Sequence, residues 1–228
     1  MNIVPSKIWL KAKKIIPGGN GLLSKRPERF SNLFWPTYFS KAEGIKIWDL
    51  NKKKFIDMSI MGIGTSTLGY RNNAIDSKVK LAINKSVNTT LNSLDEYLLA
   101  KKILKYDKFA NKVKFARSGG EAMSIAIRIA RAKNKHSKIA FSGYHGWQDW
   151  YISQTSMNGG IPQTIKKYSH RFEYGNLDAL EKLLKRFKDN TACIILEPVS
   201  KTQPICKNLC GNCKKLNVCM GYLKGVRK

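Results

Sequence analysis

The stretch from 112 to 146 constrains the fold of this chain more than any other. Val113–Ala116 is a short apolar run of strand type, and Glu121–Lys133 carries apolar side chains at helical spacing. The turn Ser118-Gly119-Gly120 joins them, and Lys138–Phe141 predicts the next strand. Glycines at the start of a helix leave backbone N–H groups free, and the helix dipole favours an anion there. The stretch therefore predicts an anion site, although a plain glycine turn between strand and helix explains the same residues.

A second glycine-rich turn, Gly143-Tyr144-His145-Gly146, follows the predicted strand at 138–141. In an open parallel sheet the carboxyl ends of neighbouring strands meet at one edge. Tyr144 and His145 are therefore expected near the anion site, where an aromatic ring can cover a flat ligand. The alternative for Tyr144 is a packed core aromatic.

Strands and helices alternate along most of the chain. Tyr38 to Met58 predicts short β-type pieces with a hairpin, and helices are expected over 73–86, 94–104 and 175–187. Ala192 to Leu196 is expected to be a buried strand. Such alternation indicates an α/β fold with a mainly parallel sheet and helices on both faces.

Several motifs follow one another in an order typical of a known family. They are Ile16-Pro17-Gly18-Gly19, 38–49, 55–58, 117–132, 143–146, 172–176 and Ile194-Ile195-Leu196-Glu197-Pro198-Val199. Together they resemble the class III pyridoxal-phosphate aminotransferases, most closely the glutamate-1-semialdehyde aminomutase branch, from about residue 7 to residue 199. The resemblance implies a fold-type I enzyme. Residues 1–60 would form the N-terminal segment and small-domain hairpin, and residues 61–199 part of the large, cofactor-binding domain.

The resemblance also assigns cofactor-binding roles for pyridoxal 5'-phosphate. The run Ser118, Gly119 and Gly120 would bind the phosphate, Tyr144 would cover the ring, and Glu197 would lie beside the cofactor. His145 would sit behind the ring or orient its neighbours. Glu197 has a plain alternative as a strand-end carboxylate. Many relatives carry a hydroxyl residue at the position of Gly120, so one phosphate hydrogen bond is expected to be missing here or to come from Ser118.

No catalytic residue is identifiable. In the family, the aspartate that pairs with the pyridine nitrogen and the lysine that binds the cofactor covalently both lie beyond the Glu-Pro motif. After Glu197 this sequence has no acidic residue, and it ends at Lys228. A complete enzyme of the family is roughly twice as long, so the resemblance implies its N-terminal, truncated half. Intact relatives would be homodimers acting on a small amino or semialdehyde substrate.

The last segment, residues 200–228, differs from the rest in composition. Four cysteines fall within fourteen residues: Cys206, Cys210, Cys213 and Cys219. Such density indicates an iron–sulfur cluster or a zinc site in a reducing compartment. The segment resembles the cysteine-rich cluster domain of certain radical S-adenosylmethionine enzymes. The alternative for this segment is a disordered fragment or an out-of-frame translation of the missing aminotransferase half. The alternative function for the chain is a catalytically inactive truncated or chimeric binding protein with a thiolate metal or iron–sulfur tail.

The charge of the chain is extreme, with 42 Lys and Arg against 15 Asp and Glu and a net charge of +27. A dense cationic face binds nucleic acid by releasing counterions, but thirty-three of these residues are lysines, spread through helices and loops rather than concentrated in an arginine-rich arm. No specific nucleic-acid partner is therefore expected. The N-terminal segment does not have the form of a signal peptide, and no apolar run reaches eighteen residues. A cytoplasmic protein without a membrane partner is expected.

Overall fold

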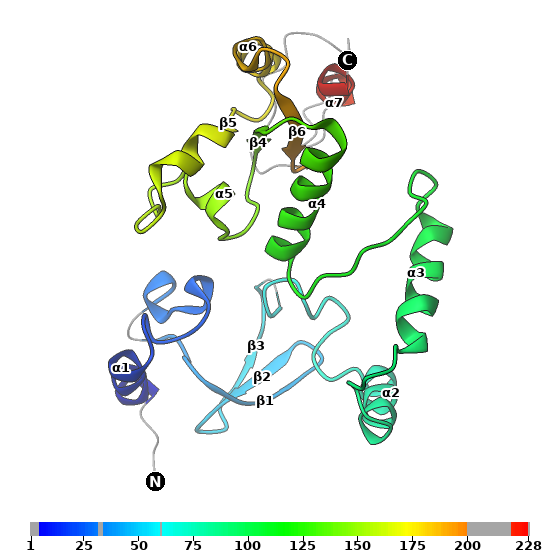
Figure 1. The fold of residues 1–228 in the computed structure, drawn as a ribbon. Coiled ribbons are helices and arrows are strands. Elements are labelled where there is room, and N and C mark those ends of the chain that lie inside the picture. The colour runs from blue at the N-terminus through cyan, green and yellow to red at the C-terminus, as the bar shows by residue number, and fades with distance from the viewer. Residues whose placement is uncertain (1–4, 32–33, 60, 200–219, 228) are drawn as a thin grey trace. The chain divides into compact units, whose positions relative to one another are not determined.

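The computed structural model describes residues 5–31, 34–59, 61–199 and 220–227. The contacts within the chain divide it into two compact units, Met1–Leu99 and Ala100–Lys228 (Figure 1). No helix among the described residues is long and apolar enough to cross a membrane.

The first unit combines short helices with a small antiparallel sheet of strand order β1-β2-β3. Its elements are α1 (Pro5–Ile15), η1 (Leu23–Lys25), η2 (Pro27–Arg29), β1 (Phe39–Glu43), β2 (Lys46–Asp49), β3 (Lys54–Ile56) and α2 (Asn73–Asn84), with the start of α3 (Leu94–Tyr106). In the β2–β3 turn the Asp49 carboxylate accepts the N–H groups of Asn51 and Lys53, both at 2.9 Å. The predicted hairpin is therefore confirmed, extended by one further strand.

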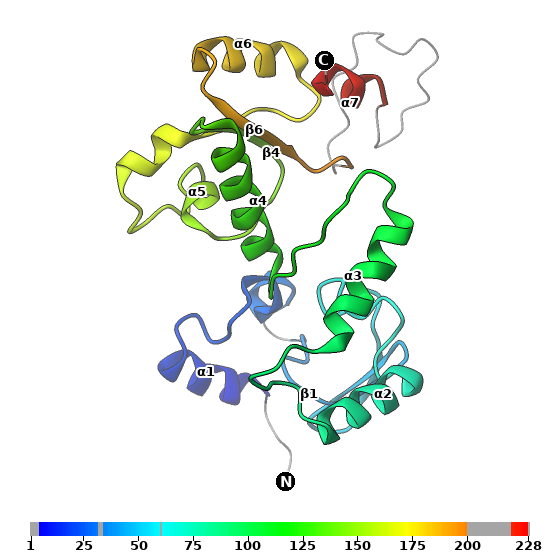
Figure 2. The same ribbon diagram turned by 45° about the vertical axis from the view of Figure 1, so that its right-hand side comes forward.

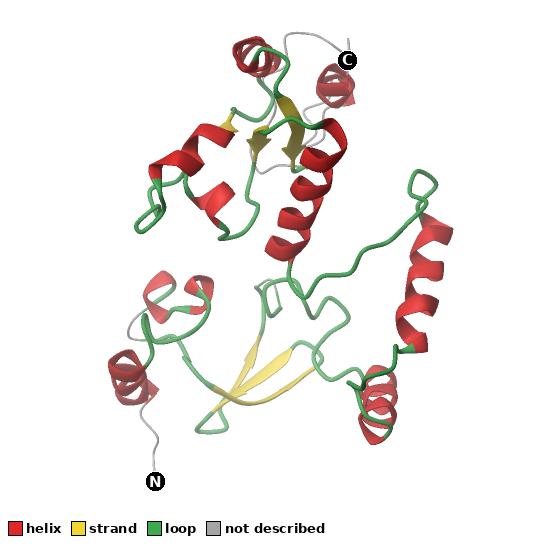
Figure 3. Ribbon diagram, in the orientation of Figure 1, coloured by secondary structure: helices red, strands yellow, loops and turns green. Residues whose placement is uncertain are grey.

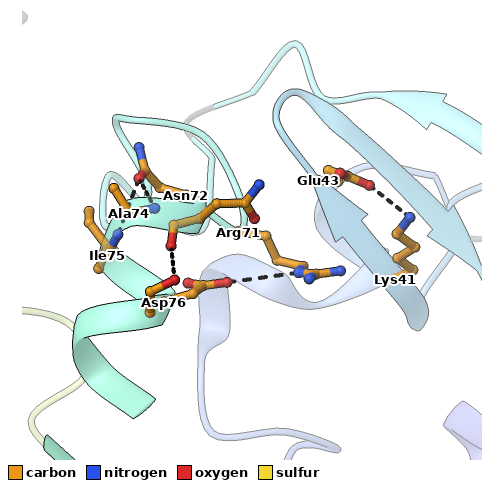
Figure 4. A network of polar contacts seen from close by, with 9 residues as sticks. Lys41, Glu43, Arg71, Asn72, Ala74, Ile75 and Asp76 are labelled. Carbon is orange, nitrogen blue, oxygen red and sulfur yellow. Dashed lines mark hydrogen bonds and ion pairs between the residues drawn. The ribbon is translucent and has the colours of Figure 1, made fainter. Parts of the chain in front are cut away.

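Helix α2 begins where the sequence predicts and ends earlier. The Asn72 side chain accepts the N–H groups of Ala74 at 3.2 Å and Ile75 at 3.3 Å, which caps the helix (Figure 4). Asp76 in the first turn pairs with Arg71 at 3.8 Å. The helix was expected to reach Ser86, but that residue has a positive φ of 74°, outside the right-handed helical region.

The second unit is a three-stranded parallel sheet of order β5-β4-β6 with helices around it (Figure 3). Its elements are α4 (Gly119–Asn134), β4 (Lys138–Ser142), α5 (Asp149–Ile152), η3 (Gln163–Tyr168), β5 (Ser169–Arg171), α6 (Leu177–Phe187), β6 (Thr191–Leu196) and α7 (Met220–Arg227). The predicted helices and the two predicted strands at β4 and β6 are confirmed.

Successive residues of β4 pack into different halves of the core, as the alternation of side chains along a strand requires. Phe141 joins a cluster with Ile127 of α4 and Trp150 of α5. Ala140 instead packs with Leu180 and Phe187 of α6. Figure 2 shows α4 and α6 on opposite sides of the strands. Helices on both faces confirm the expected α/β layering.

One expected strand is not present. Residues 113–116 form no strand, and no described residue pairs with them. The prediction was wrong because an apolar run becomes a strand only when a neighbour satisfies its backbone groups. The run therefore leads into α4 as a connecting segment that forms no strand-to-strand hydrogen bonds in the part of the chain described.

Helix α7 is packed into the second unit. Tyr222 is buried, with its ring 5.0 Å from that of Tyr174. A Cβ on Gly225 would lie 2.4 Å from a methyl carbon of Leu177, so the two helices approach closely at this glycine. Val226 contacts the apolar cluster that contains Ala140. Residues 220–227 are thus part of a folded core, whatever the origin of the segment before them.

His170 gives the second unit a predicted pH dependence. Burial lowers its pKa, the hydrogen bond that its ring donates to the backbone carbonyl of Lys167 opposes the effect, and the charges of Arg186 and Lys138 lower the pKa further. A histidine whose folded-state pKa is depressed adds stability above its unfolded pKa, and that stability is lost as the pH falls through the folded pKa. We therefore expect the melting temperature to fall as the pH drops from about 7 to 5. The His170→Gln variant should show a smaller decrease over the same range, and an unchanged decrease would contradict this assignment.

Candidate cofactor site

The start of α4 is fixed by its own side chains. Ser118 is the N-cap, and its Oγ accepts the N–H of Glu121 at 3.2 Å. The Glu121 carboxylate in turn accepts the N–H of Arg117 at 2.9 Å and pairs with its guanidinium at 3.4 Å. The arrangement is a variant of the capping box, in which Glu121 accepts from the residue before the N-cap rather than from the N-cap itself. Among the described residues, the N–H groups of Gly119 and Gly120 have no hydrogen-bond partner, so the helix start keeps two donors for an anion.

The carboxyl ends of β4 and β6 meet at one edge of the sheet, because the two strands are parallel neighbours. Glu197 follows β6, and its Oε2 accepts the N–H of Tyr144 at 3.4 Å. Gly143 has a φ of +95°, and a Cβ there would lie 2.5 Å from Glu197 Oε2. Position 143 therefore requires glycine for both its backbone angle and its space. The contact brings Tyr144 and Glu197 to one edge of the sheet.

Tyr144 projects into solvent, with 68% of its surface exposed. Its ring contacts only the edge of Tyr151 among the rings described, at a centroid distance of 5.6 Å. The alternative of a packed core aromatic is therefore wrong for Tyr144. Burial raises the pKa of the neighbouring Tyr151. The charge of Arg171 lowers this pKa, whereas Tyr144 and Glu197 raise it. Tyr144 keeps a free ring face, whereas Tyr151 serves as its support.

His145 points the other way, into the core. It is 7% exposed and lies edge-on to Phe141 and Tyr151, with Trp150 tilted beside it. Its Nε2 lies 2.9 Å from the carbonyl oxygen of Ser142 and must carry the proton, because a carbonyl only accepts. Of the two expected roles for His145, this position favours orienting the neighbouring turn.

Sequence reasoning missed Gln148. Its side chain lies against Gly120, where an added Cβ would fall 2.2 Å from Oε1 and 2.6 Å from Cδ. The same amide lies against Gly146, which ties the two glycine turns together. Gln148 follows the Gly-Tyr-His-Gly turn by two residues, and that proximity was the one signal available. The space that a side chain at position 120 would need is thus occupied by the side chain of Gln148.

The predicted metal ligands Cys206, Cys210, Cys213 and Cys219 lie outside the described residues, so the iron–sulfur or zinc site stays a prediction from spacing. Within the described residues, no group of three or more His, Cys, Asp or Glu side chains could hold a metal ion. Cys193 on β6 is a free thiol in the part of the chain described, and burial raises its pKa.

The arrangement of parallel strands, glycine turns and helix start defines a fold-type I pyridoxal-phosphate transferase. The FumI protein of Sphingopyxis sp. MTA144 has this fold, with a TM-score of 0.83 at 21% identity over 98% of this chain and 51% of that one. A glutamate-1-semialdehyde aminomutase from Pseudomonas aeruginosa PAO1 matches with a TM-score of 0.73 at 15% identity, covering 98% and 48% of the two chains.

The sequence comparisons are more specific than the fold. The family model for class III aminotransferases matches residues 30–203, and the chain belongs to this family. A 3-aminobutyryl-CoA aminotransferase from Cloacimonas acidaminovorans is 33% identical over 84% of this chain and 45% of its own length. A glutamate-1-semialdehyde 2,1-aminomutase from Wigglesworthia glossinidia brevipalpis is 31% identical, covering 87% and 48%. The chain therefore spans about half the length of these relatives.

The residues at the sheet edge fit pyridoxal phosphate, the cofactor on which the family depends. Two free N–H groups at a helix start suit a phosphate. The glycines at 120 and 146 let backbone and amide approach closely, where a Cβ would collide. The exposed ring of Tyr144 suits a flat heterocycle.

Proposed function

We propose that this chain binds pyridoxal 5'-phosphate at the start of α4 and contributes to an aminotransferase or aminomutase reaction on a small amino or semialdehyde substrate. The observation that carries the proposal is the pair of free N–H groups at Gly119 and Gly120, beside the edge where Tyr144 and Glu197 meet. An anion donor set and an exposed ring at one sheet edge support a phosphorylated aromatic cofactor.

When bound, the cofactor supplies an electron sink for bonds at the carbon that bears the amino group. The residues of this chain hold and orient it. The run Ser118-Gly119-Gly120 binds the phosphate, with Ser118 also holding the helix start in place. Tyr144 covers the ring, and Glu197 keeps the Tyr144 turn in register through its hydrogen bond to the backbone. His145 supports that turn from the core through Ser142.

The relatives include an aminotransferase and aminomutases, so both activities are retained in the proposal. A homodimer, a cytoplasmic location and the division into residues 1–60, 61–199 and 200–228 also stay predictions. A competing function is that of a catalytically inactive binding protein that carries a thiolate metal tail. The spacing of the four cysteines favours the metal in that alternative.

Phosphate binding is the first property to test, because the start of α4 needs no distant residue. We expect pyridoxal phosphate, and inorganic phosphate more weakly, to shift the amide resonances of Gly119, Gly120 and Glu121. Pyridoxal without phosphate should leave these resonances nearly unchanged. Shifts spread over scattered lysines would show non-specific attraction of anions to a chain of net charge +27, and they would refute the assigned site.

A further inference from the structure

The side-chain amide of Gln148 occupies the space beside Gly120 and Gly146, where any residue other than glycine would place a Cβ. A Cβ on Gly120 would lie 2.2 Å from its Oε1 and 2.3 Å from its Nε2, and a Cβ on Gly146 would lie 2.6 Å from Oε1. The same Cβ on Gly146 would lie 3.0 Å from the Cα of Gly120. The amide is therefore held where the turn before α4 meets the turn after β4.

The two ends of this amide differ in their hydrogen bonding. Oε1 accepts the N–H of Trp147 at 3.2 Å, which orients the group. Nε2 carries two hydrogens, and the hydrogen bond described for this side chain uses Oε1 rather than Nε2. The side chain is half-buried, but Nε2 is not among the buried polar atoms without a partner, so its two hydrogens are open to solvent or to a ligand. The donor stands against Gly120, whose N–H and that of Gly119 are themselves free.

We propose that Gln148 is a further ligand of the cofactor phosphate, donating from Nε2 beside the Gly119 and Gly120 N–H groups. This inference rests on the proposed function, since it needs the phosphate at the start of α4. The Gln148 amide would supply a hydrogen-bond donor from a second loop. That donor would replace the hydroxyl that many relatives carry at the position of Gly120. It also couples phosphate binding to the turn that carries Tyr144.

The test compares the affinities of wild type, Gln148→Ala and Gln163→Ala for pyridoxal phosphate, pyridoxal and inorganic phosphate. Gln163 is an exposed glutamine in the same unit and serves as the matched control. Loss of a hydrogen bond to a charged group weakens binding by roughly tenfold or more. We expect that loss for Gln148→Ala with both phosphate ligands, no change with pyridoxal, and wild-type behaviour for Gln163→Ala.

Gln148→Glu keeps the shape but replaces the donors with a carboxylate, so it tests the proposal even if the alanine variant fails to fold. It should weaken phosphate binding more than alanine does. In the Gln148→Ala background, Gly120→Ser should restore part of the affinity, because the new side chain then has the space. If Gln148→Ala binds pyridoxal phosphate with wild-type affinity, this inference is overturned but the proposed function is not. The same holds if Gln148→Ala loses as much affinity for pyridoxal as for pyridoxal phosphate. Absence of phosphate shifts at Gly119 and Gly120 in the wild type overturns the proposed function as well.

Discussion

A polypeptide of these 228 residues, saturated with pyridoxal phosphate, is expected to exchange no measurable amino group between an amino acid and a keto acid. The reaction needs a lysine that holds the cofactor covalently and moves the proton at the reacting carbon. It also needs an acid beside the pyridine nitrogen, and the segment after Glu197 has no acidic residue. A positioned proton-transfer group contributes about 10²–10⁴-fold to a rate. The family resemblance places both groups beyond the Glu-Pro motif, so a polypeptide that holds neither should react at the rate of free cofactor.

Borohydride reduction followed by peptide mapping checks this expectation. The label should be sparse and spread over many lysines, as exposed amines would give. Ser118→Ala provides the control, because it weakens the proposed phosphate site without removing a lysine and should leave the labelling pattern unchanged. One lysine labelled stoichiometrically, together with amino-group exchange, would show that the chain carries its own catalytic lysine.

Local signals in the sequence were enough to predict most of the second unit. The start of α4 is fixed within five residues, because Ser118 Oγ accepts the N–H of Glu121 and the Glu121 carboxylate accepts the N–H of Arg117. The positions of β4, α6 and β6 follow from apolar runs and helical spacing, and the structure confirms them. The contact of Tyr144 with Glu197 arises from the parallel order of β4 and β6, which those local patterns do not give.

The remaining features depend on contacts between distant residues. The run 113–116 has strand-type composition, yet composition cannot show whether a neighbouring strand is present. His145 stands beside Tyr144 in the sequence but faces the core, a difference that depends on the aromatic side chains around it. The place of Gln148 depends on two glycines from different turns meeting at one point. Spacing alone carries none of this information.

The second large effect is expected from Tyr222→Ala, which tests whether α7 is an integral part of the second unit. The ring of Tyr222 is buried and lies 5.0 Å from that of Tyr174. Replacing a buried aromatic with alanine costs roughly 3–5 kcal/mol, a large share of the 5–15 kcal/mol typical of a folded domain. The urea midpoint of unfolding should therefore fall sharply.

Lys224→Ala is the matched control, because Lys224 lies on the same helix with its side chain exposed and alanine preserves helix propensity. It should leave the urea midpoint nearly unchanged. If both variants unfold at the wild-type midpoint, α7 does not pack on α6, and the segment 200–228 is a join that adds nothing to the fold. A sharp loss confined to Tyr222→Ala would instead mean that the cysteine-rich stretch is anchored at both ends, by β6 before it and by α7 after it. An anchored stretch brings its thiolates together at a lower cost in chain entropy, which favours the metal site that the cysteine spacing predicts.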